Sequence, residues 1–240
     1  MIRLNQKEIV FLYNASGGVK SAALYSTDLA GNVSTAAVAF TLDKTRPAAV
    51  TDFRLDSFLA ASGRVDLAFT APSDNLSGVA DYIIKAATFP VSEVNFDDAP
   101  VFAQGLTAQQ AGLAELFSIP VSTGATLYFA LKSRDVAGNY SDISNVAVMD
   151  AQAPSLGAIS PAPAGFVNRP ASFSVQAADD IGVSAVVFSV DGVDLSTRTA
   201  PPYSFKWDIL AFANGEHTLS ARATDAAGNQ TIVSGLYNVL

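Results

Sequence analysis

Three copies of one acidic turn motif are the residues in this sequence whose types and spacing best suit ligand binding. The copies are Asp28-Leu29-Ala30-Gly31-Asn32, Asp135-Val136-Ala137-Gly138-Asn139 and Asp225-Ala226-Ala227-Gly228-Asn229. Each copy lies between stretches in which apolar and polar residues alternate, as they do in paired strands. The copies are separated by roughly 100 residues, about the length of one β-sandwich domain. The spacing therefore predicts a tandem array that carries the same hairpin in each domain.

Two further kinds of acidic motif accompany the second and third turns. An Asp-x-x-x-Pro linker precedes each of the two later domains, and each domain has an Asp-containing loop between two expected strands, at residues 74–78 and 179–182. In a sandwich of the immunoglobulin type, which the resemblance given below implies, the linker, this loop and the repeated turn share one end of the domain. Clustered oxygen ligands of this kind suit Ca²⁺. The candidate ligands are Asp43, Asp74, Asp135 and Asn139 at the first domain junction, and Asp150, Asp179, Asp180, Asp225 and Asn229 at the second.

The same motifs have an alternative explanation that needs no ligand. In Asp-x-Ala-Gly-Asn the glycine supplies a positive φ, and the Asp and Asn side chains cap the turn through hydrogen bonds to backbone. Asp-x-x-x-Pro is an ordinary linker, because proline ends strand pairing and keeps the chain extended. For any single motif the turn-capping explanation is the stronger one. The calcium prediction depends on three acidic motifs meeting at one end of a domain, twice.

No catalytic constellation is recognisable. The one histidine, His217, follows an expected turn and is predicted to be structural, and the chain has no cysteine. Asp97 and Asp98 form a carboxylate pair, but the surrounding sequence predicts a solvated loop rather than a cleft. Neither a nucleophile elbow nor a glycine-rich phosphate-binding motif occurs. The protein is therefore predicted not to be an enzyme.

Composition favours sheets and excludes several classes of partner. The 240 residues carry a formal net charge of −8, with 50% hydrophobic and only 15% charged residues. Such a chain has no basic surface that would neutralise phosphates, so a nucleic acid partner is not expected. No run of about 18 apolar residues predicts a membrane span, and the first residues lack the pattern of a signal peptide. No cofactor other than Ca²⁺ is suggested.

The two linkers are the expected domain boundaries. Residues 1–46 hold only three strand candidates, Ile9–Tyr13, Ser21–Thr27 and Ser34–Leu42, whereas a sandwich needs about seven strands. We therefore expect residues 1–46 to be the C-terminal part of a domain, followed by complete domains at residues 47–149 and 150–240.

Strand candidates fill both complete domains. In the first they are Val50–Leu55, Arg64–Thr70, Val79–Ala86, Leu113–Ile119, Thr126–Arg134 and Ile143–Met149, with loops expected over residues 90–110. In the second they are Ala171–Ala177, Val183–Val190, Tyr203–Asp208, His217–Asp225 and Thr231–Leu240. Asp191-Gly192 is expected to be a type I′ hairpin turn. Trp207, the one tryptophan, is expected in the core.

Longer strings within these domains resemble known families. YFALKSRDVAGNYSDISNVAV, within residues 47–149, resembles fibronectin type III domains of the bacterial secreted kind, although Phe69 stands where that family usually has tryptophan. DDIGVSAVVFSVDG, PYSFKWD and NGEHTLSARATDAAGN resemble bacterial immunoglobulin-like domains. YSTDLAGNVS and FTLDKTRP resemble the end of another such domain. The resemblance implies an all-β fold of tandem immunoglobulin-like β-sandwiches, a half-domain plus two complete domains.

Function is implied by this resemblance rather than by any single motif. Such domains occur as repeats in bacterial adhesins and surface proteins, which implies an extracellular, secreted or cell-surface, non-catalytic spacer or adhesion array. The alternative is an accessory module that positions a substrate or carbohydrate for a secreted hydrolase. The expected partners are flanking domains of the same polypeptide, and beyond them a cell-surface protein or polysaccharide.

Overall fold

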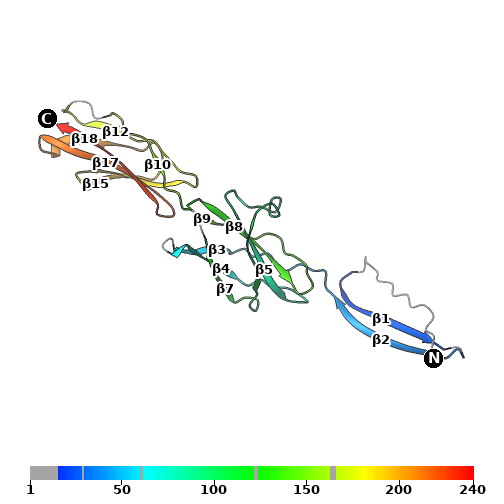
Figure 1. Ribbon diagram of the computed structural model, residues 1–240. Helices are drawn as coiled ribbons and strands as arrows, with labels where there is room; N and C mark the ends of the chain where they lie inside the picture. The colour runs from blue at the N-terminus through cyan, green and yellow to red at the C-terminus, as the bar shows by residue number, and fades with distance from the viewer. Residues whose placement is uncertain (1–15, 29, 60–61, 122–123, 163–165) are drawn as a thin grey trace. The chain divides into compact units, whose positions relative to one another are not determined.

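The computed structural model describes residues 16–28, 30–59, 62–121, 124–162 and 166–240 as an all-β chain (Figure 1). It divides into two compact units. The first comprises Met1–Val121 and Tyr128–Ala147, and the second comprises Ser122–Leu127 and Val148–Leu240. The predicted fold class of tandem sandwiches is confirmed by the two sets of sheets described below.

A two-stranded hairpin begins the described part of the chain. Strand β1 (Gly18–Thr27) pairs antiparallel with β2 (Val33–Leu42) across the first acidic turn. Both strands were predicted, and each begins one to three residues earlier than the alternation suggested. The third candidate, Ile9–Tyr13, lies outside the described residues.

The first sandwich consists of a three-stranded and a four-stranded sheet. The order in the first sheet is β3-β4-β7, with bounds Arg54–Leu59, Arg64–Thr70 and Ala114–Pro120. The order in the second is β6-β5-β8-β9, with bounds Val101–Thr107, Val79–Ala87, Leu127–Asp135 and Ala147–Met149. The loop β4–β5 carries Asp74, and the turn after β8 begins at Asp135, so two of the three acidic motifs lie where they were expected.

An aromatic contact between the two sheets lies in the core of this sandwich. Phe69 of β4 and Tyr82 of β5 are almost fully buried, and their rings meet edge-to-face with centroids 4.8 Å apart. Because β4 and β5 belong to different sheets, this contact joins the two layers. Phe69, which stands where the resemblance to fibronectin type III domains predicts a tryptophan, is thus a core residue. Burying each such side chain stabilises the fold by roughly 1.5–3 kcal/mol.

Three predictions in this sandwich were wrong in part. The last strand, β9, begins at Ala147 rather than at Ile143. The first strand begins at Arg54 rather than Val50, because the backbone of Phe53 is bonded to a side chain instead of a ladder. The Phe53 N–H donates to Asn145 Oδ1 at 2.9 Å, and its carbonyl accepts from Asn145 Nδ2 at 2.7 Å. The expected loop over residues 90–110 contains β6, which shifts register twice against β5 and therefore has no clean alternation.

The second sandwich has a five-stranded sheet, ordered β11-β18-β17-β14-β15, and two short pairs, β12-β16 and β10-β13. The sheet's strands are Phe166–Val167, Gln230–Val239, Gly215–Asp225, Val183–Val190 and Val193–Arg198. The pairs are Ala171–Ser174 with Ser204–Trp207, and Ser155–Leu156 with Ala177–Ala178. The predicted strand Ala171–Ala177 is therefore split, and the two-residue strands were too short to show a period. A 3₁₀ turn, η2 (Ile209–Ala211), follows β16.

Several details of the second sandwich were predicted correctly. Asp191 and Gly192 have φ values of 50° and 80°, as a type I′ turn requires. Trp207 is 1% exposed and packs in the core with Phe173 and Tyr237. His217 has a structural role, because its ring nitrogens meet Asp191 Oδ2 at 2.5 Å and the Ala213 carbonyl at 2.8 Å.

Candidate metal centre

The repeated turn closes in the same way in all three copies. In the second copy, Asp135 Oδ1 accepts the Asn139 backbone N–H at 2.8 Å, and Asp135 Oδ2 accepts Asn139 Nδ2 at 2.7 Å. The corresponding distances are 2.9 and 2.8 Å in the first copy and 2.9 and 2.9 Å in the third. The predicted turn-capping role of the aspartate and asparagine is therefore confirmed.

The asparagine of the turn also contacts the linker. Asn139 Nδ2 donates to the Asp43 carbonyl, and Asn229 Nδ2 donates to the Asp150 carbonyl, both at 3.3 Å. Each turn therefore fixes the linker aspartate of its own unit beside its own aspartate. The amide groups of these two asparagines face oxygen acceptors, which makes them positioning residues for the two acidic clusters.

Two acidic clusters of matching composition result. Cluster 1 comprises Asp43, Asp74 and Asp135, and cluster 2 comprises Asp150, Asp179 and Asp225. Within each cluster, one carboxylate oxygen from every residue lies within 4.8 Å of the others. Each cluster thus combines the linker, one inter-strand loop (β4–β5 in cluster 1, β13–β14 in cluster 2) and the repeated turn, as the sequence suggested. Asp180 is not part of either group.

The loop aspartate of each cluster has one oxygen committed to the backbone and one without a partner. Asp74 Oδ2 accepts the N–H groups of Leu76, Ser77 and Gly78 at 2.8–3.2 Å. Asp179 Oδ2 accepts those of Ile181 and Gly182 at 3.0 and 2.8 Å. The other oxygens, Oδ1 of Asp74 and Oδ1 of Asp179, are buried and accept no hydrogen bond.

The linker aspartates differ between the clusters. Both oxygens of Asp43 are bonded, Oδ1 to the Thr45 N–H at 2.9 Å and Oδ2 to the Ser77 N–H at 3.1 Å. Asp150 Oδ1 accepts from Thr126 Oγ1 at 3.2 Å and from Gln152 N at 3.1 Å, but Asp150 Oδ2 is buried without a partner. Cluster 2 therefore contains two unpaired buried carboxylate oxygens and cluster 1 contains one.

The electrostatics of the linker aspartates follow these contacts. Hydrogen bonding by Ser77, and then by Thr45, lowers the pKa of Asp43 below its ordinary value. Burial raises the pKa of Asp150, and repulsion by Asp225 and Asp179 raises it further against the hydrogen bonds that it accepts. The negative charge of cluster 2 is consequently less well compensated by protein groups than that of cluster 1.

A hard divalent cation fits both clusters. A buried carboxylate oxygen without a partner costs roughly 1–3 kcal/mol or more, and a bound cation would remove that cost together with the mutual repulsion. Three carboxylates with free lone pairs would supply part of the six to eight oxygens that Ca²⁺ takes, and water would supply others. The unpaired atoms Asp74 Oδ1, Asp150 Oδ2 and Asp179 Oδ1 are the features that sequence alone did not reveal. Thr126 was also missed, because nothing in its sequence neighbourhood relates it to Asp150.

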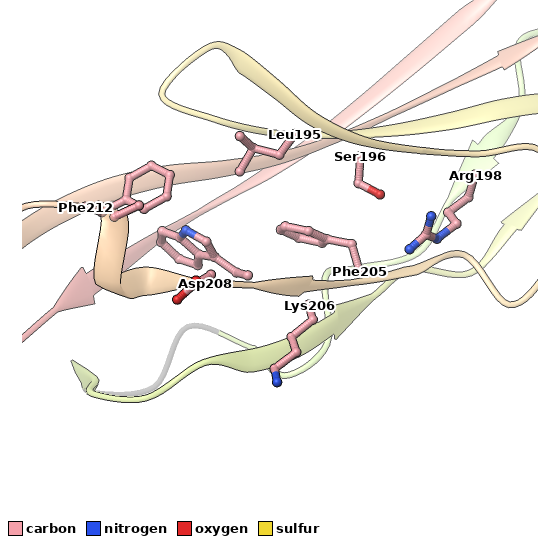
Figure 2. Close-up of a pocket in the computed structure, with 9 residues that line it drawn as sticks. Leu195, Ser196, Arg198, Phe205, Lys206, Asp208 and Phe212 are labelled. Carbon is pink, nitrogen blue, oxygen red and sulfur yellow. The ribbon is translucent and has the colours of Figure 1, made fainter.

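A separate pocket lies along β15 and β16 (Figure 2). Its lining combines Phe205, Phe212 and Leu195 with the charged side chains of Arg198 and Lys206. The Arg198 guanidinium is held by the Ser204 carbonyl, to which its Nε donates at 2.7 Å. The pocket brings together none of the candidate ligands named from the sequence.

Comparison with known proteins supports the family assigned to the second sandwich. Residues 154–221 match the family model described as bacterial Ig domain. This segment resembles the bacterial immunoglobulin-like domain, as its sequence predicted. No match was found among curated proteins.

Two solved structures illustrate what the search of known structures matched. The fibronectin(III)-like modules of Clostridium thermocellum CbhA are 14% identical over 82% of this chain and 91% of theirs, with a TM-score of 0.37. A tetra-tandem repeat from the extending region of a large adhesion protein is 17% identical over 96% of this chain and 59% of its own, with a TM-score of 0.42. Among the described residues, no helix is long and apolar enough to cross a membrane.

Proposed function

We propose that this chain is a non-catalytic spacer segment of an extracellular bacterial protein, and that each of its two units binds one Ca²⁺ ion. The observation that carries the proposal is the pair of matching acidic clusters with unpaired buried carboxylate oxygens. Turn capping accounts for the bonded oxygens of these aspartates, but it does not account for three buried oxygens that accept nothing. Without a bound cation, the free-energy cost of these unpaired buried oxygens would remain in both clusters.

The proposed location follows from the affinity expected of such sites. Extracellular calcium modules have dissociation constants of roughly 10⁻⁴–10⁻³ M, so they are filled where calcium is millimolar and empty in cytosol. An array with two such sites would therefore be stabilised after export. Bacterial Ig domains, to which residues 154–221 are similar, are consistent with that location.

The ion's role in a spacer is to anchor the linker. Asp43 and Asp150 belong to the Asp-x-x-x-Pro segments, and each contributes to the cluster of its own unit. A cation shared by the linker, the loop and the turn would hold the linker against the sandwich that it enters. The extracellular spacer function thus depends on a calcium-dependent rigidity of these segments rather than on a reactive group.

Calorimetric titration of the purified chain tests the proposal. Two Ca²⁺ ions per chain are expected at low ionic strength, with weaker binding of Mg²⁺, because Mg²⁺ demands near-ideal octahedral geometry. Asp74→Asn and Asp179→Asn should each remove one site. Absence of binding heat, together with superimposable melting curves in calcium and in chelator, would leave these aspartates with turn and linker roles only.

A further inference from the structure

Among the described residues, nothing covers one face of the hairpin β1–β2, although that face has the pattern of a buried one. Within the described residues, neither strand pairs with anything but its partner. Val38 and Phe40 lie at alternate positions of β2, and so on one face, and they are 61% and 43% exposed. Because isolated two-stranded hairpins are at best marginally stable, a stable fold requires another layer packed on this face.

The chain itself contains a covered equivalent of this hairpin, β17–β18. Each hairpin has ten residue pairs, and the register of the pairs is the same in both. The last pair is Gly18 opposite Leu42 in the first hairpin and Gly215 opposite Val239 in the second. Both terminal glycines have a positive φ, 101° and 135°. With the identical turn bonds described above, this makes the two hairpins equivalent residue by residue.

The equivalence identifies which side chains are built for burial. Phe40 stands at the position of Tyr237, which is 3% exposed in the second sandwich. Ala22 opposite Val38 replaces Leu219 opposite Gly235, so the larger side chain of the pair has moved from one strand to the other. Such exchanges conserve the volume that a core must fill.

The equivalence also shows what covers such a face. The Tyr237 ring packs edge-to-face on Phe173 of β12 at 5.1 Å and lies 6.4 Å from Trp207 of β16. At the two edges, β14 pairs antiparallel with β17, and β11 pairs parallel with β18. The covering layer is thus a sheet with aromatic side chains on its inner face, and flanking strands complete both edges.

The edges of β1–β2 are suited to receive such strands. The sequence of β2, VSTAAVAFTL, has no charged residue, no proline and no glycine. Natural edge strands that must stay unpaired are usually protected by charges, proline or bulges, and β2 has none of these. An unprotected edge beside an uncovered apolar face indicates a surface that pairs.

We propose that β1–β2 is the docking surface for the other half of a third immunoglobulin-like sandwich, a sheet whose inner face offers aromatic side chains to Phe40 and Val38. Lys20 occupies the position of His217, which meets the Asp191 carboxylate and lies 6.1 Å from the Trp207 ring. The partner sheet should therefore also present an acidic or aromatic group to Lys20. This proposal does not depend on calcium binding.

A chimeric chain tests this proposal. Residues 1–17 are replaced by a second copy of residues 151–214, so that Gly18 follows the copied Asn214 as Gly215 does in the native sequence. The rest of the chain is unchanged. We expect amide hydrogen exchange in β1–β2 to slow by about tenfold or more relative to the unaltered chain, because the strands acquire both neighbours and a covering layer.

Two lysine variants on opposite faces of β2 provide the matched control. In the chimera, Val38→Lys places a charge on the covered face and should restore fast exchange. Val33→Lys lies on the opposite face, at the position of the exposed Gln230, and should leave the protection intact.

Three outcomes would overturn the proposal. The first is a copied segment that stays unfolded, since the same residues fold against β17–β18. The second is a folded copy that leaves the hairpin unprotected. The third is an unaltered chain that forms a dimer abolished by Val38→Lys, which would make a second copy the occupant.

Discussion

Asp150→Asn is the substitution that separates calcium binding from turn chemistry. Asparagine keeps the shape of the side chain and can keep the acceptor that Thr126 and Gln152 use, while its amide group replaces the unpaired Oδ2. The substitution removes one of three carboxylates whose oxygens lie within 4.8 Å of one another. At an effective dielectric constant of 20, each such pair repels by roughly 3 kcal/mol before hydrogen bonds offset it. In chelator we therefore expect the second unit to gain about 1–2 kcal/mol, or about 5 °C or more in Tm.

In calcium the effect should reverse. At about 10 mM Ca²⁺, roughly 100 times a dissociation constant of 10⁻⁴ M, binding adds about 2.7 kcal/mol to the stability of the native unit. That corresponds to an increase of about 10 °C or more for a domain of this size. Asp150→Asn should lose most of this increment, because a neutral side chain takes the place of an anionic ligand. The variant is thus expected to be more stable than the native chain in chelator and less stable in calcium.

The fluorescence of Trp207 is the assay for this reversal. Trp207 is the one tryptophan of the chain and is buried in the core of the second sandwich, so its emission follows the unfolding of that unit alone. The matched control is Asp43→Asn in the first unit, followed by calorimetry. Both oxygens of Asp43 accept backbone N–H groups, so an amide there faces a donor and should lower stability in chelator. Equal destabilisation by both variants in chelator, with an unchanged calcium increment, would refute the reasoning.

The remaining predictions each concern one residue. Both ring nitrogens of His217 face oxygen acceptors, and these acceptors, Asp191 first and the Ala213 carbonyl second, raise the pKa of His217. The protonated ring therefore stabilises the folded state below pH about 6.5, and this stabilisation is lost as pH rises through the higher pKa of the folded state. His217→Gln should flatten this fall of about 1 kcal/mol in the Trp207 melting curves between pH 6 and 9, and an unchanged slope would exclude His217 as its source. Asn145→Ala should destabilise the first unit by about 1–3 kcal/mol in calorimetry, because the N–H and carbonyl of Phe53 lose their hydrogen-bond partners. Asn139→Ala should in addition loosen the linker, because the Asp43 carbonyl loses the hydrogen bond from Asn139 Nδ2. On a glycan array the native chain should show no strong signal, because Trp207 is 1% exposed and its ring offers no free face for sugar stacking. Strong binding that depends on Trp207 would instead favour the alternative function, an accessory module of a secreted hydrolase.

Strand positions were predictable where a strand is long and alternates without interruption. Arg64–Thr70 and Val183–Val190 were located to the residue, because a buried face on one side imposes the two-residue period. Strand β6 was missed because its register against β5 shifts twice, which breaks the period that sequence can show. Strands β10, β11 and β13 have two residues each, too few to carry any period.

The candidate site was predictable in its membership but not in its chemistry. Residue type and spacing identified all six aspartates of the two clusters. They also named Asp180 beside Asp179, and Asp180 lies outside the cluster. Whether an oxygen is paired depends on which backbone N–H groups turn toward it. That is set by the folded loop, as the bonds of Ser77 to both Asp43 and Asp74 show.

Turn capping and calcium binding are compatible uses of one carboxylate. An ionised aspartate has about four lone-pair positions. In Asp135 and Asp225 the turn uses one position on each oxygen, through the backbone and side-chain N–H groups of the following asparagine. The remaining positions stay open beside the neighbouring carboxylates of each cluster. The first copy, Asp28, makes the same two bonds although no acidic cluster surrounds it among the described residues, so the motif suffices to close a hairpin. The cluster is therefore an addition to the turn, and it depends on the linker and loop aspartates that only a complete sandwich brings to it.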